Sequence, residues 1–118
     1  MVEKEFNIDK EERGEITILR PNGPVDAIAL VPFKKTIDAL CKSKKPCVIL
    51  DGVAVTYLDS QAAGLVATLH RQALLKGGRV VLCGLSPRIE RSLDLLGLGQ
   101  RLDRYANVDE ALASFEKS

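Results

Sequence analysis

A short, wholly apolar run followed by a turn and a helix start constrains this fold more than any other part of the sequence. Residues 48–50 read Val-Ile-Leu, as expected of a strand that is buried on both faces of a sheet. Asp51 ends that strand, and the pair Asp59-Ser60 then precedes a run of apolar residues at helical spacing. The pair therefore lies where a helix has its N-cap and first turn. We expect the function of the protein to depend on this turn.

The rest of the chain alternates between short strands and amphipathic helices. Apolar residues that alternate with polar ones predict an opening strand pair around Phe6–Ile8 and Ile16–Ile18, and Arg79–Cys83 is predicted to form a further strand. Leu102–Tyr105 fits a short edge strand. Because a proline breaks the hydrogen-bond ladder inside a helix, the first helix is expected to start at about Pro32. The predicted helices cover about residues 32–43, 60–76, 86–97 and the segment from Asn107 onwards.

These elements predict an α/β fold in one domain that spans residues 1–118. A strand, a helix and a second strand of the same sheet almost always form a parallel, right-handed crossover. We therefore expect a mixed, mostly parallel sheet of about four to five strands with about four helices packed on it. A chain of 118 residues, 46% of them hydrophobic, is long enough to bury one core without disulfides or metals.

Charge balance and cysteine usage argue against several classes of function. The chain has 17 basic and 16 acidic residues, which does not suit binding dominated by nucleic-acid phosphates. The N-terminal segment is charged, and no apolar run approaches the length needed to cross a bilayer. We expect a cytoplasmic protein without direct membrane insertion, although a partner could recruit it to a membrane complex. The three cysteines lack metal-ligand spacing and are expected to be reduced thiols: Cys41, Cys47 and Cys83.

The residues needed for catalysis are missing around Ser60. A serine hydrolase needs a base beside its nucleophile, and the only histidine, His70, lies about 15 Å further along the same helix. A response-regulator receiver with Asp51 as phosphoacceptor would need an acidic pair after the first strand to hold magnesium, and we do not expect such a site here. Asp51 is expected instead to form the turn by accepting backbone N–H groups. We expect no catalytic activity, no metal ion and no cofactor.

Six short motifs follow one another along nearly the whole chain. They are Val25-Asp26, Leu50-Asp51, Tyr57-Leu58-Asp59-Ser60, Gly77-Gly78, Leu85-Ser86-Pro87 and Leu96-Gly97-Leu98. In this order they resemble the landmarks of the STAS domain of anti-sigma factor antagonists. The hallmark of that family is a strand, a short loop that ends in an aromatic residue, and an Asp-Ser pair before a helix. No single motif is specific, but the ordered set is.

The resemblance implies a protein-binding switch. Members of the family sequester an anti-sigma factor that is also a serine kinase, and phosphorylation of the serine after the family's aspartate breaks the complex. The matching serine is Ser60. The predicted partner-binding residues are Asp26, Tyr57, Asp59, Gln61 and Ala62. A phosphate on a serine at a helix N-terminus would face free N–H groups and the positive end of the helix dipole. It would therefore change the surface without unfolding the domain.

Other interpretations stay open. An Asp-Ser pair before an apolar helix is by itself an ordinary cap, and only the ordered landmarks favour a regulatory serine. The family commonly has Ser or Ala, Gly, Leu and Gly after this pair, whereas this chain has Gln-Ala-Ala-Gly at residues 61–64. That departure favours a non-enzymatic STAS scaffold in a lipid-transport or stress-sensing complex, while the intact Asp59-Ser60 favours the switch. A small-ligand binder lacks a motif; a thermal-shift screen with nucleotides and fatty acids would detect one.

Overall fold

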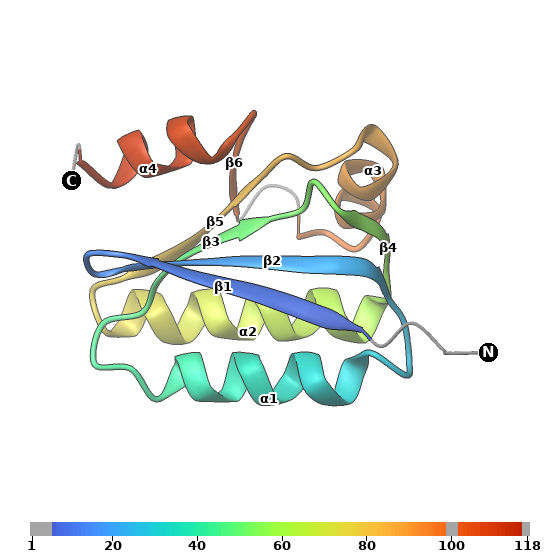
Figure 1. Cartoon of the computed structure of the whole chain (residues 1–118), viewed down its shortest axis with the longest axis horizontal. Helices are drawn as coiled ribbons and strands as arrows, with labels where there is room; N and C mark the ends of the chain where they lie inside the picture. Colours follow the sequence, from blue (N-terminus) through green and yellow to red (C-terminus); the bar gives the residue numbers. More distant parts are fainter. Residues whose placement is uncertain (1–5, 99–101, 117–118) are drawn as a thin grey trace.

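The computed structural model describes residues 6–98 and 102–116, which form one six-stranded sheet with helices on both faces (Figure 1). The strands are β1 (Asn7–Arg13), β2 (Ile16–Val25), β3 (Cys47–Asp51), β4 (Val55–Leu58), β5 (Arg79–Cys83) and β6 (Asp103–Tyr105). The helices are α1 (Leu30–Cys41), α2 (Ser60–Leu75), α3 (Pro87–Leu95) and α4 (Val108–Glu116). The strand order is β1-β2-β3-β5-β6, and β4 pairs with β2 outside this path. Only β1 and β2 are antiparallel among the paired strands described.

The predicted fold class is confirmed, with four helices and a mixed, mostly parallel sheet in the described residues. The sheet has one strand more than the four to five expected, because β4 forms inside a segment that was predicted as a loop. Residues 55–58, Val-Thr-Tyr-Leu, do not alternate strictly between apolar and polar side chains, so the pattern did not predict a strand there. Residues 16–19 of β2 pair with β3, and its last residues, Gly23–Val25, pair with β4 instead. Residues 1–5, 99–101 and 117–118 lie outside the described range, so the single domain over residues 1–118 stays a prediction.

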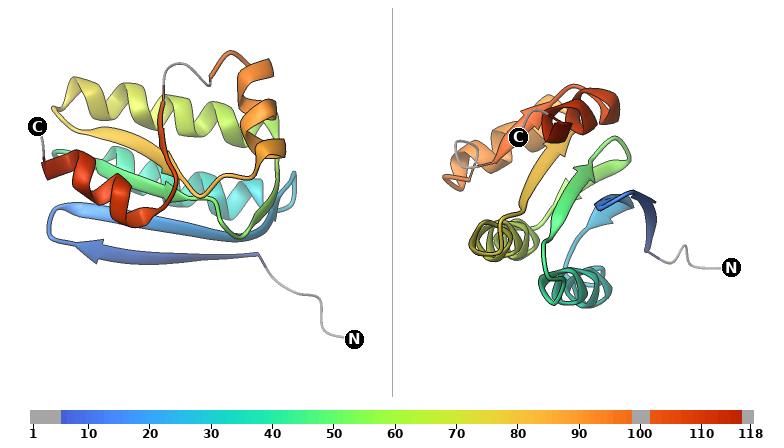
Figure 2. Two further views of the ribbon diagram at one scale, coloured as in Figure 1. Left: turned by 90° about the horizontal axis from the view of Figure 1, so that it is seen from above. Right: turned by 90° about the vertical axis from the view of Figure 1, so that its left-hand side faces the viewer.

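Each face of the sheet carries its own apolar core. Helices α1 and α2 lie side by side on one face and α4 lies on the other (Figures 1 and 2). Phe33 of α1 and Ile89 of α3 belong to the first core, and Ala111 of α4 belongs to the second. Ile18 and Leu19 are neighbours in β2 but enter different cores, because successive side chains of a strand point to opposite faces. Strand β3 is buried along its whole length, as predicted for its apolar run.

Helix α1 begins at Leu30, slightly before the predicted start at Pro32. Pro32 lies in the first turn, where backbone N–H groups have no partner within the helix and a missing donor is tolerated. Asp26 holds the turn that precedes the helix. Its Oδ1 accepts hydrogen bonds from the backbone N–H groups of Ile28, at 3.1 Å, and Ala29, at 3.0 Å. Asp26 thereby determines how the chain passes from β2 into α1.

Helix α2 ends at Leu75, close to the predicted end at about residue 76, and the glycine pair Gly77-Gly78 follows it. Gly77 has a φ of 83°, the left-handed conformation that commonly ends a helix. Gly78 is needed for space, since a Cβ at this position would lie 1.9 Å from the carbonyl oxygen of Pro46. At the same end of the molecule the Lys76 ammonium donates a hydrogen bond to the carbonyl oxygen of Cys41. The C-cap residue of α2 therefore satisfies a carbonyl that the end of α1 leaves unpaired.

His70 has a structural role that was not predicted. It is half-buried on α2, and its Nδ1 accepts a hydrogen bond from the backbone N–H of Val80 in β5 at 3.0 Å. The pairing of β5 with β6 begins one residue later, at Val81. The imidazole thus accepts a hydrogen bond from β5 one residue before the pairing of β5 with β6 begins. This contact makes His70 part of the packing between helix and sheet.

Candidate functional site

Ser60 is the first residue of α2 and lies exposed at the edge of the sheet where the parallel strands end. The residue before it, Asp59, is the N-cap, with an extended backbone at φ −64° and ψ 148°. Its Oδ1 accepts a hydrogen bond of 2.7 Å from the backbone N–H of Gln61. An aspartate in this role satisfies a donor that the helix itself leaves free. The predicted N-cap and first-turn positions of the Asp-Ser pair are confirmed.

A backbone hydrogen bond brings the start of α2 beside the end of β2. The N–H of Asp59 donates to the carbonyl oxygen of Val25 at 2.9 Å, which continues the pairing of β2 with β4. Tyr57 precedes this bond in β4 and is 53% exposed. The turn held by Asp26 follows directly on the β2 side. The predicted site residues that gather at this edge are Asp26, Tyr57, Asp59, Ser60 and Gln61.

The surroundings of Ser60 suit an added anion. The first turn of α2 contains no acidic residue, and the N-terminus of a helix carries a partial positive charge. The carboxylate of the preceding residue, Asp59, accepts a hydrogen bond from the N–H of Gln61. A phosphate on the Ser60 Oγ would therefore meet the favourable end of the dipole.

Ala62 does not belong to the exposed surface, and the prediction that it contacts a partner is wrong for its side chain. It is 0% exposed and packs in the core between α2 and the sheet. The preceding Gln61 is exposed. The difference follows from helix geometry, since one residue rotates the side chain by about 100° around the axis. Ala62 therefore belongs to the core that underlies this surface and not to the surface itself.

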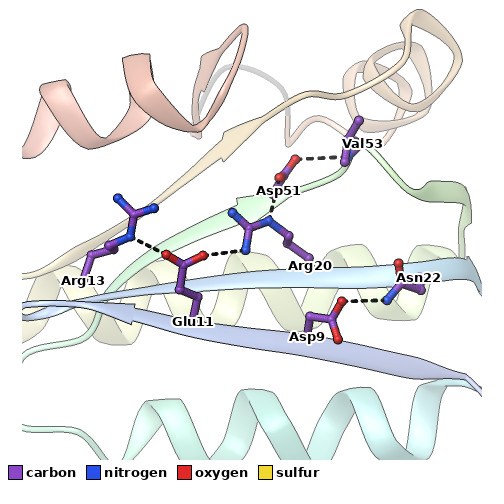
Figure 3. Close-up of polar contacts among 7 residues, drawn as sticks. All are labelled: Asp9, Glu11, Arg13, Arg20, Asn22, Asp51 and Val53. Atoms are coloured by element: carbon purple, nitrogen blue, oxygen red, sulfur yellow. Dashed lines mark hydrogen bonds and ion pairs between the residues drawn. The ribbon is translucent and has the colours of Figure 1, made fainter.

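Asp51 lies in a polar network beneath the loop that leads towards Ser60 (Figure 3). Its Oδ1 accepts a hydrogen bond of 3.2 Å from the N–H of Val53, which confirms its predicted turn-forming role. Its Oδ2 lies 3.2 Å from the Nε of Arg20 in β2. The same guanidinium donates through Nη1 to Glu11 of β1 at 2.9 Å, and Glu11 also pairs with Arg13. The network links three strands to the loop that follows β3.

The network shifts the titration of its members. Hydrogen bonds from Arg20, and then from Arg13, lower the pKa of Glu11 below its usual value of 4.5. Cys83 is buried next to Asp51, and burial together with that carboxylate raises the pKa of its thiol to about 12. Cys47 is also buried, Cys41 is half-buried, and all three cysteines are free thiols. Cys83 is therefore held in its neutral form.

The sequence did not reveal which apolar side chains this edge leaves exposed. Ile28 is 85% exposed in the turn before α1, and Val53 is 72% exposed in the loop after β3. In the sequence both look like ordinary core residues, so no signal marked them.

Within residues 6–98 and 102–116, no group of three or more histidine, cysteine or acidic side chains could hold a metal ion. No helix in that same part is long and apolar enough to cross a membrane.

Fold and site together define a class: a small α/β domain that presents a serine at an exposed helix N-terminus, on the edge where its parallel strands end. The family model of the STAS domain matches residues 7–111, and the chain belongs to this family.

Individual relatives agree with this assignment. The chain is 24% identical over 112 residues to an anti-sigma F factor antagonist of Paenibacillus polymyxa, covering 94% of this chain and 96% of that protein. The structure of an anti-sigma factor antagonist from Mycobacterium paratuberculosis matches with a TM-score of 0.83 and 20% identity, over 93% of each chain. The anti-sigma factor antagonist SpoIIAA in its unphosphorylated form matches with a TM-score of 0.78 and 23% identity, over 97% of this chain and 98% of that one. The structural matches establish a common fold.

Proposed function

We propose that this protein is an anti-sigma factor antagonist that acts as a phosphorylation-controlled binding switch and not as an enzyme. The observation that carries the proposal is the position of Ser60, exposed on the first turn of α2 directly after its N-cap. When Ser60 is unphosphorylated, this edge binds an anti-sigma factor that has serine kinase activity and so frees a sigma factor. Phosphorylation of Ser60 by that kinase releases the partner.

The switch works through the surface and leaves the fold intact. A phosphoryl group on Ser60 Oγ adds up to about two negative charges and three acceptor oxygens. The helix dipole favours this charge while α2 is free. A partner that covers Ser60 would have to strip water from the phosphate, and burying an unpaired charge is strongly unfavourable. The partner therefore leaves while the domain stays folded.

The remaining partner-binding residues surround Ser60 at the same edge: Asp26, Tyr57, Asp59 and Gln61. Asp26 acts by holding the turn before α1, whereas Tyr57 and Gln61 offer exposed side chains. A cytoplasmic location, a role in transcription regulation, and the absence of direct nucleic-acid or membrane binding belong to this proposal.

Binding measurements with the purified anti-sigma factor kinases of the source organism test the proposal. Wild type and Ser60→Ala should bind one of them, and Ser60→Asp should bind it about tenfold more weakly or worse. Ser43→Asp is the matched control, because Ser43 is exposed in the turn after α1, away from the strand ends that carry Ser60. It adds the same charge and should leave binding unchanged.

Intact-mass spectrometry of the protein from its own cells, with peptide mapping, gives an independent test. Phosphate on Ser60 in a fraction of the molecules is the expected result. Equal binding by wild type and Ser60→Asp, together with unmodified Ser60 under growth and stress, would reject the switch. A scaffold subunit of a transport or stress-sensing complex would then be the better description.

A further inference from the structure

An apolar groove of about 350 Å³ lies between the later turns of α2 and two leucines, one that follows α3 and one that precedes β6. The residues that line this α2 groove are Ala67, His70, Arg71, Leu74, Leu98 and Leu102. Arg71 follows Ser60 by eleven residues, which is about 16 Å along the helix axis. The α2 groove is therefore separate from the edge of the sheet that carries Ser60.

The end of α3 holds Leu98 in the wall of the groove. Gly97 has a φ of 75°, and the backbone N–H of Leu98 donates to the carbonyl oxygen of Leu93 at 3.0 Å. The N–H of Gly97 donates to the carbonyl oxygen of Asp94, also at 3.0 Å. These two bonds form a Schellman motif, in which a glycine turns the chain back across the end of its helix. The motif Leu96-Gly97-Leu98 thus fixes one wall of the α2 groove.

Two other lining residues are fixed in the free protein as well. The hydrogen bond that His70 Nδ1 accepts from the N–H of Val80 holds the imidazole in place. Leu102 is 4% exposed and belongs to the first core, whereas Leu74 lies at the rim and is 56% exposed. A largely preformed, mostly apolar groove of a few hundred Å³ with a small number of polar groups is typical of a small-molecule site.

Arg71 brings to this groove a positive charge that the protein does not neutralise. Its side chain is exposed. Among residues 6–98 and 102–116 it forms no ion pair, and its one hydrogen bond runs from Nη2 to Thr68 Oγ1 at 3.5 Å, which is long for such a bond. Helix α2 itself contains no acidic residue. The guanidinium therefore keeps its donors for a carboxylate from outside, which it can bind through two parallel hydrogen bonds.

A second groove of similar size suits an anion less well. It holds about 360 Å³ at the starts of β2, β3 and β5, and Arg79 is part of its lining. The Nη2 of Arg79 donates to the carbonyl oxygen of Ser114 at 2.8 Å, and its Nη1 lies 3.4 Å from Asp103 Oδ2. The same lining also includes two side chains of opposite charge, Lys45 and Glu15. The arginine there is already engaged, whereas Arg71 is not.

We propose that the α2 groove binds a small aliphatic monocarboxylate. The carboxylate pairs with Arg71, and the aliphatic chain lies against Leu74, Leu98 and Leu102. At about 30 Å³ for each water-sized group, a volume of about 350 Å³ holds roughly twelve non-hydrogen atoms. The chain is therefore of medium length, about eight to ten carbons. This site is independent of the switch at Ser60 and goes beyond it.

Thermal unfolding of the full chain, with sodium octanoate as the probe, tests the inference. A ligand that binds the folded state raises the melting temperature, and octanoate should do so in a saturable way. Octan-1-ol has the chain without the carboxylate, and acetate has the carboxylate without the chain. Each should give a clearly smaller shift than octanoate. Equal shifts with octanoate and octan-1-ol would mean adsorption to exposed apolar surface and would overturn the site.

Two substitutions test the charge and the groove separately, with affinity measured by titration calorimetry. Arg71→Gln removes the cation at an exposed position and should weaken octanoate binding about fivefold or more. Ala67→Phe fills the groove and should abolish binding, and the melting temperature of this variant without ligand shows whether it folds. Arg88→Gln is the matched control, because Arg88 is exposed on α3 and outside the groove lining. Wild-type affinity in Arg71→Gln would refute the proposed pairing.

Amide chemical shifts in an NMR titration locate the ligand. The amides of Arg71, Leu74 and Leu98 should move along the octanoate binding curve, while the amide of Ser60 stays in place. Shifts centred on Ser60 or on Arg79 would put the ligand elsewhere and reject the α2 groove. The absence of both amide shifts and thermal stabilisation below the micelle concentration of octanoate would reject it too. None of these measurements involves the anti-sigma factor kinase, so the site and the switch can fail independently.

Discussion

Arg20 in β2 and Asp51 at the end of β3 form an ion pair across neighbouring parallel strands, with Nε 3.2 Å from Oδ2. Asp51 is 7% exposed and is the only buried polar or charged residue among those described. Its second oxygen binds the N–H of Val53 in the loop that leads to β4. The pair therefore connects the middle of the sheet to the segment that ends at Ser60.

Replacing Arg20 by methionine should destabilise the protein by about 1–3 kcal/mol, because a buried carboxylate would lose its cation. Arg13→Met is the matched control, since its ion pair with Glu11 is more exposed and should contribute less than about 1 kcal/mol. Urea unfolding measures both free energies. Equal losses in the two variants would mean that the burial of Asp51 adds nothing to its pairing with Arg20.

Glu11 should contribute to the loss of stability in acid. Its folded pKa lies below the usual value of 4.5 because Arg20 and Arg13 bind the ionised carboxylate. A lowered folded pKa gives a stabilisation that is present above the unfolded pKa and is lost as pH falls through the folded pKa. The difference in unfolding free energy between wild type and Glu11→Gln should be constant above pH 4.5 and shrink below it. A difference that persists unchanged into acid would contradict this assignment.

Cys83 should resist thiol reagents in the folded protein and weaken the fold at high pH. Its pKa is raised from 9.0 to about 12, mainly by burial and then by the charge of Asp51. A raised folded pKa gives stability that is complete below the unfolded value and is lost as pH rises towards the folded one. Cys83→Ala should start less stable, because it leaves a small cavity, but lose less stability above pH 9.0. In native protein a disulfide reagent should modify the half-buried Cys41 first; equal rates at the two thiols would refute the protected state of Cys83.

Replacing Gly78 and Gly64 by alanine should change the free energy of unfolding in opposite directions, because Gly78 is buried and Gly64 is exposed. Gly78→Ala places a Cβ 1.9 Å from the Pro46 carbonyl oxygen and 2.7 Å from its carbon, so it should cost about 3 kcal/mol or prevent folding. Gly64→Ala meets open space and should gain about 0.5–1 kcal/mol. Thermal and urea unfolding compare them. A destabilised Gly64→Ala would indicate a structural need for glycine that the contacts do not reveal.

Local signals predicted the parts of this protein that local physics controls. Three consecutive apolar residues mark β3 because both of its faces are covered. Asp59 is an N-cap because its short carboxylate reaches the N–H of Gln61 within the same turn. Gly77 stops α2 because glycine tolerates the left-handed conformation. The cap and the helix stop require contacts only a few residues apart, and the apolar run of β3 is itself a pattern of neighbouring residues.

The sequence by itself therefore determined the α/β class, the main strands and helices, and the place of Ser60 at a helix start. Tertiary structure alone decided that Ala62 points inward, that Ile28 stays exposed, and that Arg20 meets Asp51 from 31 residues away. It also decided that Val55–Leu58 becomes a strand, since β4 exists through its pairing with β2. The physical reason is that burial, pairing and ion contacts between distant segments depend on how the elements pack. No pattern of neighbouring residues encodes that packing.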